Sequence, residues 1–205
     1  MDEISDEALK EFWKICQWTF EVWETHKTIF ENSDFKKAIR ETPAEYTMWM
    51  FSEISHEYSL LQIAKLHDPV KTGKSSNLSL NYIIKHGNWD FETNKKLCEI
   101  LGKMDGFYNK IKPARDKVIS HADYDSTMNI QIHGKFSAGE DDRYFECLED
   151  FLKTIGMARL NCDFSFLPFS ESEARRFMKT FKTRKEIDEQ EEREIESILK
   201  PKSNN

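Results

Sequence analysis

The chain has 205 residues, of which 39% are hydrophobic and 33% charged, and its formal net charge is −7. This length supports one domain with a tail or at most two small domains, and 15 phenylalanines with 5 tryptophans are enough for a real core. Scarce glycine and proline disfavour β-sandwiches and barrels, no apolar run reaches the length of a membrane span, and the acidic balance argues against non-specific nucleic-acid binding.

The N-terminal stretch MDEISDEALKEF is acidic and amphipathic, which is unlike a secretory signal. The four cysteines are dispersed without a CxxC pair: Cys16, Cys98, Cys147 and Cys162. We expect them to be small core residues of a reduced, cytoplasmic protein, with an undetected disulfide as the alternative.

Residues 5–31 begin the helical part of the chain. Their apolar side chains recur at steps of three and four, which predicts one long amphipathic helix. Ser5, followed by two acidic residues, suits the start of this helix because oxygen atoms and negative charge favour its free N–H groups. The stretch 35–39 can add a short helix.

Thr42 and Pro43 predict the N-cap and the first position of a second long helix. We expect this helix to end within LHDP, residues 66–69, because the residue before a proline is pushed away from helical geometry. Residues 69–78 are polar and predict a loop. A short helix over residues 78–86 should follow.

Another long helix is predicted from Asp90, with apolar residues in phase from Leu97 to Val118. Pro113 should kink this helix rather than end it, since the apolar stripe continues on both sides. The kink would fall just before Arg115.

Residues 124–140 interrupt the helical pattern, and 129–133 alternate weakly, as in a short strand or an ordered loop. Residues 141–159 predict another amphipathic helix. A linker then leads to a terminal helix, for which Ser170 and Glu173 form the S-x-x-E pattern of a capping box. We expect the final KPKSNN to be disordered.

Together these elements predict an all-α fold, an antiparallel bundle of four to five helices with a charged C-terminal helical extension. We place the bundle in residues 1–165 and the charged helix with its tail in residues 166–205. Residues 175–185 are basic and could contact RNA, but we favour a helix that docks through Phe177 and Phe181 with its cations in water.

Several familiar catalytic patterns are missing from the sequence. HExxH is absent, and the single E-x-x-H at Glu53 and His56 is better explained by two polar groups on the solvent side of a helix. VKTGKSS at residues 70–76 lacks the earlier glycine and the preceding strand of a P-loop. We therefore expect neither a metal nor a cofactor.

ARDKVISHAD, residues 114–123, is the one cluster with usable chemistry. RNA carries its own nucleophile, the 2′-OH beside each phosphate. Cleavage without a metal then needs a proton-transfer group with a pKa near 7, which His121 supplies. It also needs a permanent cation on the phosphate, which Arg115 supplies. The remaining candidates would orient these groups or contact flanking phosphates: Asp116, Asp123, Lys112 and Lys117.

A simpler interpretation of the motif stays open. An Arg followed six places later by a His arises by chance roughly 0.2 times in such a chain. On a regular helix the two side chains would also lie about 120° apart and about 9 Å along the axis. Arg115 would then pair with a nearby acid, and His121 would favour the negative end of its helix.

Three stretches together resemble the abortive-infection, AbiU-like branch of the HEPN superfamily: LLQIAKLHDP at 60–69, NLSL at 77–80 and ARDKVISHAD at 114–123. LHDP is interpreted as a helix stop, and NLSL as a helix start with a core leucine. Neither has an evident chemical role.

The resemblance implies a four-helix bundle and a metal-independent endoribonuclease of toxin–antitoxin, phage-defence or RNA-processing systems. It also implies a homodimer that brings two motifs into one cleft, with Arg115 and His121 catalytic and Asp116 in the polar position after the arginine. Many members have Asn or His there, whereas Asp116 places a negative charge where phosphate should bind.

The sequence fits two functions. The first is RNA cleavage to a 2′,3′-cyclic phosphate in a bacterial cytoplasm, with an antitoxin or regulatory protein as a further partner and no membrane. The second is a non-catalytic HEPN-like helical module that binds a protein partner or a nucleotide.

Overall fold

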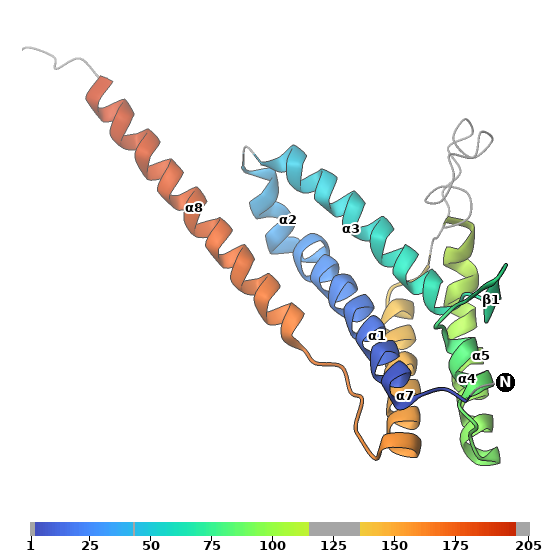
Figure 1. The fold of residues 1–205 in the computed structure, drawn as a ribbon. Coiled ribbons are helices and arrows are strands. Elements are labelled where there is room, and N and C mark those ends of the chain that lie inside the picture. The colour runs from blue at the N-terminus through green and yellow to red at the C-terminus, as the bar shows by residue number, and fades with distance from the viewer. Residues whose placement is uncertain (1–2, 43, 115–135, 200–205) are drawn as a thin grey trace, which may run out of the picture. The chain divides into compact units, whose positions relative to one another are not determined.

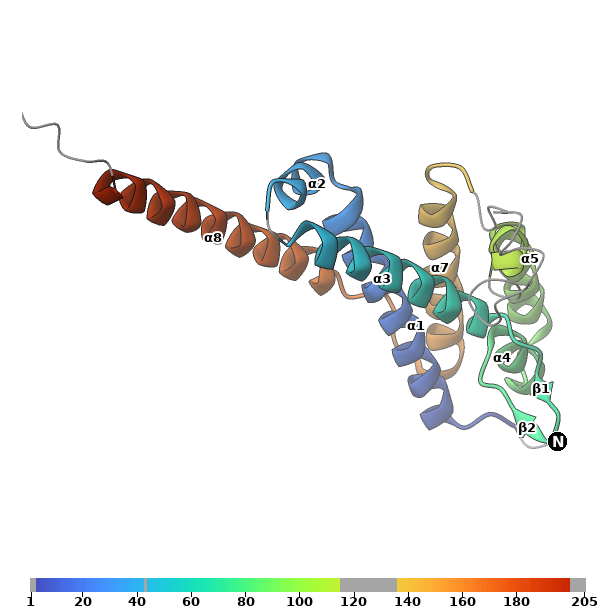
Figure 2. The same cartoon turned by 90° about the horizontal axis from the view of Figure 1, so that it is seen from above.

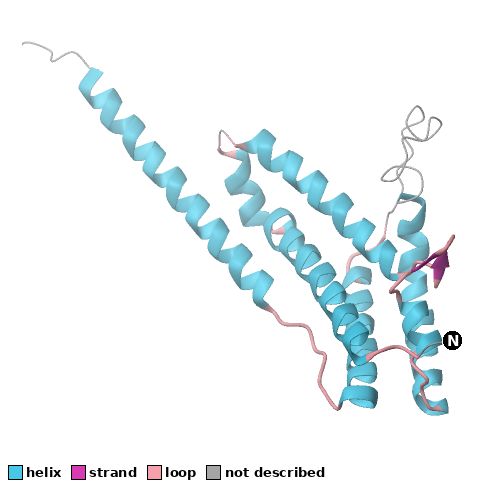
Figure 3. Cartoon of the chain, in the orientation of Figure 1, coloured by secondary structure: helices cyan, strands magenta, loops and turns pink. Residues whose placement is uncertain are grey.

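The structure is a computed structural model that describes residues 3–42, 44–114 and 136–199, apart from several side chains in the last helix. In this part of the chain helices dominate, and the predicted all-α bundle is confirmed (Figures 1 and 3). No helix among the described residues is both long and apolar enough to cross a membrane. The predicted strand or loop at 129–133 and the KPKSNN tail lie outside the described residues.

Packing divides the chain into two units. Unit 1 holds Met1–Trp23 and Ser55–Leu167, and unit 2 holds Glu24–Ile54 and Pro168–Asn205. The chain leaves unit 1 for the last time after Leu167, and unit 2 also takes in Glu24–Ile54 from the first third of the sequence.

The first helix, α1 (Asp6–His26), starts as predicted, because the Ser5 hydroxyl accepts a hydrogen bond from the Ala8 N–H over 3.2 Å. Its inward residues at helical spacing are almost inaccessible to solvent: Leu9, Phe12, Cys16 and Trp23. These four side chains form the α1 side of the unit 1 core.

The second long helix, α3 (Glu45–Leu66), ends just before His67, as the LHDP pattern predicts. Between α3 and α4 (Leu80–His86), the expected loop contains a small antiparallel hairpin of β1 (Lys71–Thr72) and β2 (Ser75–Ser76). Figure 2 shows the hairpin next to α4. Ser79 caps α4 and Leu80 is fully buried, so the interpretation of NLSL as a helix start with a core leucine is confirmed.

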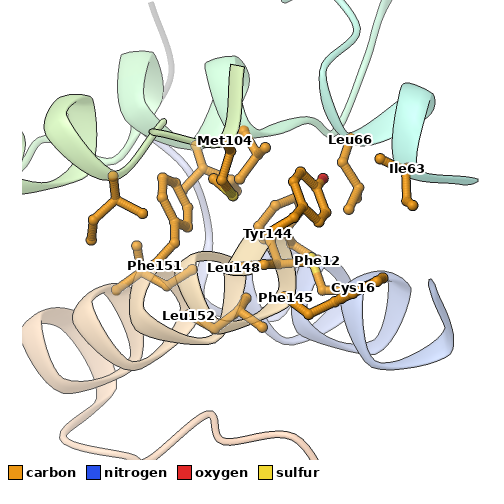
Figure 4. Packing of buried hydrophobic residues seen from close by; sticks show 14 of the residues in the cluster. Phe12, Cys16, Ile63, Leu66, Met104, Tyr144, Phe145, Leu148, Phe151 and Leu152 are labelled. Atoms are coloured by element: carbon orange, nitrogen blue, oxygen red, sulfur yellow. The ribbon is translucent and has the colours of Figure 1, made fainter. Parts of the chain in front are cut away.

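Helices α5 (Phe91–Ala114) and α7 (Glu140–Leu160) form the densest contact of unit 1. Figure 4 shows Met104 of α5 facing Leu148 and Phe151 of α7, with Phe12 of α1 and Leu66 of α3 beside them. The apolar face predicted for 141–159 is confirmed, since every inward residue of that stripe is buried: Phe145, Leu148, Phe151, Leu152 and Ile155.

Unit 2 has a smaller core. It is built from the π-helical turn η1 (Lys27–Glu31), α2 (Ser33–Arg40), the first half of α3 and α8 (Phe169–Leu199). The buried apolar side chains come from all four: Ile29, Ile39, Met48, Ala174 and Met178. The helix expected over 5–31 therefore has nearly the expected bounds, but its last five residues form a π-helical turn that the periodicity does not reveal.

Two predicted helix caps are wrong. Ser170 lies within the first turn of α8, and its buried hydroxyl has no hydrogen-bond partner in the part of the chain that the structure describes, so it does not cap the helix. The Thr42 hydroxyl donates backwards to the Ile39 carbonyl over 2.8 Å, and α3 starts only at Glu45.

Two expectations about burial also need correction. Phe177 is half exposed, and Ala174 and Met178 anchor α8 instead. The side chain of Phe181 lies outside the described part. Cysteine burial is mixed as well: Cys16 is buried, Cys147 is half-buried, and both Cys98 and Cys162 are exposed, all with free thiols.

Candidate functional site

The predicted site begins where α5 ends. Lys112 lies on the last turn of α5 and is exposed. The other predicted site residues lie outside the described residues: Arg115, Asp116, Lys117, His121 and Asp123. The structure therefore describes the end of α5, the helix that precedes Arg115, and the side chains packed around it.

The register of α5 is fixed up to the residue before Arg115. One face of the helix is buried at steps of three and four: Leu97, Ile100, Met104, Phe107, Ile111 and Ala114. Pro113 lies inside α5, one residue before its last described position, and the predicted continuation of the helix to Val118 lies outside the described residues. Because Ala114 is still packed in the protein, the chain enters the motif from an anchored helix rather than from a free end.

An ion pair joins the end of α5 to the start of α7. Lys110 Nζ donates to Glu140 Oε1 over 2.6 Å, and Glu140 Oε2 accepts from the Ser137 N–H over 3.0 Å. The hydrogen bond from Lys110 is the main reason why the pKa of Glu140 lies below its ordinary value. Lys112 has no ion-pair partner among the residues with described positions, so no described acid neutralises it.

A buried polar cluster surrounds His67, the histidine of LHDP, about two turns before the end of α5 at Ala114. His67 Nε2 lies 3.1 Å from the Tyr144 hydroxyl of α7, and His67 Nδ1 lies 3.3 Å from Asp105 Oδ1 of α5. The imidazole also stacks on the ring of Tyr108, with centroids 4.3 Å apart and planes 5° from parallel. His67 is therefore the point at which the end of α3 meets α5 and α7.

The cluster runs from the surface to the core. The His67 side chain is only 2% exposed, whereas that of Asp105 is 48% exposed. Burial lowers the pKa of His67 to about 4, although the Asp105 carboxylate acts in the opposite direction. The imidazole is therefore neutral at physiological pH, and burial also raises the pKa of Tyr144 well above its ordinary value.

The tautomer of His67 follows from its two neighbours. A carboxylate favours the proton on the nitrogen that faces it, so we assign the N–H to Nδ1. Nε2 then carries the lone pair and accepts from the Tyr144 hydroxyl. The Nδ1–Asp105 approach is loose, because its alignment does not meet hydrogen-bond geometry. The Tyr144 contact is therefore the stronger of the two.

Sequence reasoning assigned no chemical role to LHDP and missed this cluster. Its members are widely separated in the chain, and only Asp105 and Tyr108 share a local signal, since residues three apart lie on one helix face. The pairing of His67 with Tyr144 depends on the packing of α3 against α7, which no local pattern contains.

The family model HEPN_AbiU2, described as AbiU2, matches residues 2–180. This range includes all three resembling stretches and the helices from α1 to the first turns of α8. The chain belongs to the HEPN AbiU2 family. No curated protein and no solved structure gave a match.

In this HEPN AbiU2 chain the described residues contain no group of three or more His, Cys, Asp or Glu side chains placed to hold a metal ion. Glu53 is exposed and His56 is half-buried near Trp23, with ring centroids 6.1 Å apart. The histidine of E-x-x-H is thus partly an aromatic packing residue rather than a fully solvated one.

A hollow of about 590 Å³ lies between the first turns of α5 and the second half of α7, and its lining includes Thr93, Lys96, Lys153 and Thr154. Lys153 is already paired with Glu149 at 2.9 Å. The rise per residue puts Lys96 roughly 27 Å along α5 from Ala114, so this hollow is remote from the motif.

Proposed function

We propose that this HEPN AbiU2 protein is a metal-independent endoribonuclease in which Arg115 binds the phosphate and His121 moves the protons. His121 removes the proton from the 2′-OH, which attacks the adjacent phosphorus. The bond to the 5′-oxygen breaks, leaving a 2′,3′-cyclic phosphate and a 5′-hydroxyl. The observation that carries the proposal is the family match, which spans the Arg/His motif and the helix that leads into it.

The charges around the motif support a phosphate ligand. Arg115 keeps its charge at every physiological pH and can offer two parallel donors to phosphate oxygens. Lys112, exposed on the last turn of α5, and Lys117 would contact flanking phosphates and thereby position the strand. Asp116 and Asp123 are the acids available to orient the guanidinium or the imidazole.

A homodimer would complete the site. On a regular helix Arg115 and His121 point about 120° apart, so one motif alone is poorly arranged for one phosphate. A two-fold axis would place the arginine of one subunit beside the histidine of its partner. We propose that this dimer acts in the cytoplasm as a toxin or phage-defence effector, restrained by an antitoxin or another regulatory protein.

The catalytic proposal is tested with purified full-length protein, total bacterial RNA and EDTA. His121→Ala should lower the cleavage rate roughly 10²–10⁴-fold, because a positioned general acid and base contributes about that much. Arg115→Ala should cost roughly 10²–10³-fold through lost charge stabilisation. The matched controls are His86→Ala on α4 and Arg176→Ala on α8. Equal rates for wild type and His121→Ala would overturn the proposal.

The composite site has its own test. Arg115→Ala and His121→Ala proteins are mixed, allowed to exchange subunits, and assayed on the same RNA. If the arginine and histidine act across the two-fold axis, mixed dimers recover measurable cleavage that neither variant shows alone. Light scattering gives the solution mass. A monomeric wild type, or no recovery from a confirmed mixed dimer, would contradict the shared site.

A non-catalytic binding module is the second candidate, and one observation favours it. The first half of α3 exposes large apolar side chains on several sides: Tyr46, Trp49, Met50, Phe51 and Ile54. Exposed apolar patches of this kind mark interaction sites. Absence of RNA cleavage, together with partner binding that survives the double change Arg115→Ala and His121→Ala but not Trp49→Glu, would favour this function over catalysis.

A further inference from the structure

The helix that leads into the proposed active site has weak intrinsic stability near its end. Gly102 and Gly106 lie in the interior of α5, where glycine costs helix stability because its backbone is so free. Pro113 cannot donate the hydrogen bond that the Asn109 carbonyl would receive in a regular helix. The last third of α5 therefore depends on contacts from outside the helix.

The cluster around His67 supplies such contacts on the polar side of α5. Asp105 and Tyr108 are three residues apart and face the same imidazole, which the Tyr144 hydroxyl holds from α7. From Tyr108 to Ala114, the last described residue before Arg115, is six residues or about 9 Å of helix. A rotation of α5 at this point would therefore move the residue that precedes Arg115.

We propose that His67 is a positioning residue. With Tyr144 and Asp105 it fixes the last third of α5 against α3 and α7 and so sets where Arg115 meets the RNA phosphate. This inference rests on the proposed ribonuclease function for its effect on catalysis, whereas the effect on α5 itself can be measured without any activity.

Only the neutral imidazole can play this part. Neutral His67 accepts at Nε2 from the Tyr144 hydroxyl, but protonated His67 is a donor at both nitrogens, and the hydroxyl would have to turn round. The titratable groups that face the cluster come from three elements: Asp105 and Tyr108 of α5, Tyr144 of α7, and Cys16 of α1 next to Tyr144. Protonation therefore reverses this hydrogen bond and places a charge in a buried position, which weakens the packing of α3 against α5 and α7.

The test removes one oxygen atom. Tyr144→Phe keeps the ring in the core but takes the donor away from neutral His67, so the imidazole becomes easier to protonate. Amide exchange in residues 105–114 at pH 7 should rise about fivefold, as expected for one lost hydrogen bond. The acid limb of RNA cleavage, measured from pH 3.5 to pH 8 so that the range includes the His67 pKa of about 4, should move upward by about half a pH unit.

The control is Tyr82→Phe on α4, where a tyrosine also stacks on a histidine, His86, with centroids 4.4 Å apart. It should leave both the exchange of 105–114 and the pH profile unchanged. If Tyr144→Phe does not fold, Asp105→Asn on the half-exposed side of the cluster tests the same claim through faster exchange in 105–114.

The outcomes separate the two proposals. Unchanged exchange in 105–114 overturns the positioning role, whatever the activity. Faster exchange with cleavage lowered by the same factor at every pH also overturns it, because His67 would then be merely structural. If Tyr144→Phe speeds exchange but the wild-type protein cleaves no RNA at all, the result supports the role of His67 in holding α5 and refutes the ribonuclease proposal instead.

Discussion

At the scale of single residues, the most unusual group is His67. It is a histidine kept neutral by burial, in a cluster whose other polar groups satisfy only one of its two nitrogens well. A buried polar group of this kind contributes stability only in the protonation state that matches the donor or acceptor role of its hydrogen-bond partner.

His67 should make the protein acid-sensitive. Its folded-state pKa of about 4 lies below the ordinary value of 6.5, so protons bind preferentially to the unfolded chain. Stability due to His67 is complete above pH 6.5 and is lost as the pH falls towards 4. Between pH 7 and pH 4.5 this loss should amount to about 2 kcal/mol.

Urea unfolding at the two pH values measures the effect. His67→Gln keeps an acceptor for Tyr144 but cannot titrate, so the variant should lose about 2 kcal/mol less than wild type over the same interval. Identical losses in both proteins would show that carboxyl groups alone cause the acid sensitivity.

At the scale of elements, what could be predicted depended on how local the cause is. The buried stripes of α5 and α7 follow from spacing, and the starts of α1 and α4 follow from one capping serine each. The π-helical turn η1 was missed, because its buried Ile29 packs in the core of unit 2, which no local pattern contains.

The helical glycines give a paired prediction. A Cβ on Gly106 of α5 would meet no described atom within 4 Å, so Gly106→Ala should stabilise the protein by about 0.5–1 kcal/mol. A Cβ on Gly156 of α7 would lie 2.5 Å from the Cys162 carbonyl oxygen and 3.0 Å from the Phe164 ring. Gly156→Ala should therefore destabilise by about 1–3 kcal/mol despite its better helix propensity.

Urea unfolding of both glycine variants at pH 7 provides the measurement. The opposite signs are the informative part, since the chemical change is the same in two helices of one unit. If Gly156→Ala were stabilising, the backbone from Cys162 to Phe164 would have to move away from the new methyl group at little cost in free energy.

At the scale of the whole molecule, the two units should respond separately to damage. Met178→Ala removes a fully buried side chain from the small core of unit 2, and Leu148→Ala does the same in unit 1. Each should cost its own unit roughly 2–5 kcal/mol. Amide exchange should then rise in 24–54 for Met178→Ala and in α5 and α7 for Leu148→Ala. If both variants accelerate the same amides, the units unfold as one.

The candidate site was predictable only in part. The roles proposed for Arg115 and His121 come from residue types alone, because RNA cleavage by a 2′-OH needs a cation and a group that titrates near neutrality, and they stay a prediction. The His67 cluster could not be read in this way, since its three polar members come from α5, α7 and the end of α3. Long-range packing, rather than any motif, makes it a unit.

The interleaving of the two units has a consequence for how this gene can change. The chain passes from one unit to the other after Trp23, after Ile54 and after Leu167. No single breakpoint separates them, so recombination cannot exchange unit 2 as a cassette. A crossover after Leu167 would instead replace only α8 and keep the rest of the unit 2 core. Only replacement helices whose apolar face fits η1 would then give a stable protein.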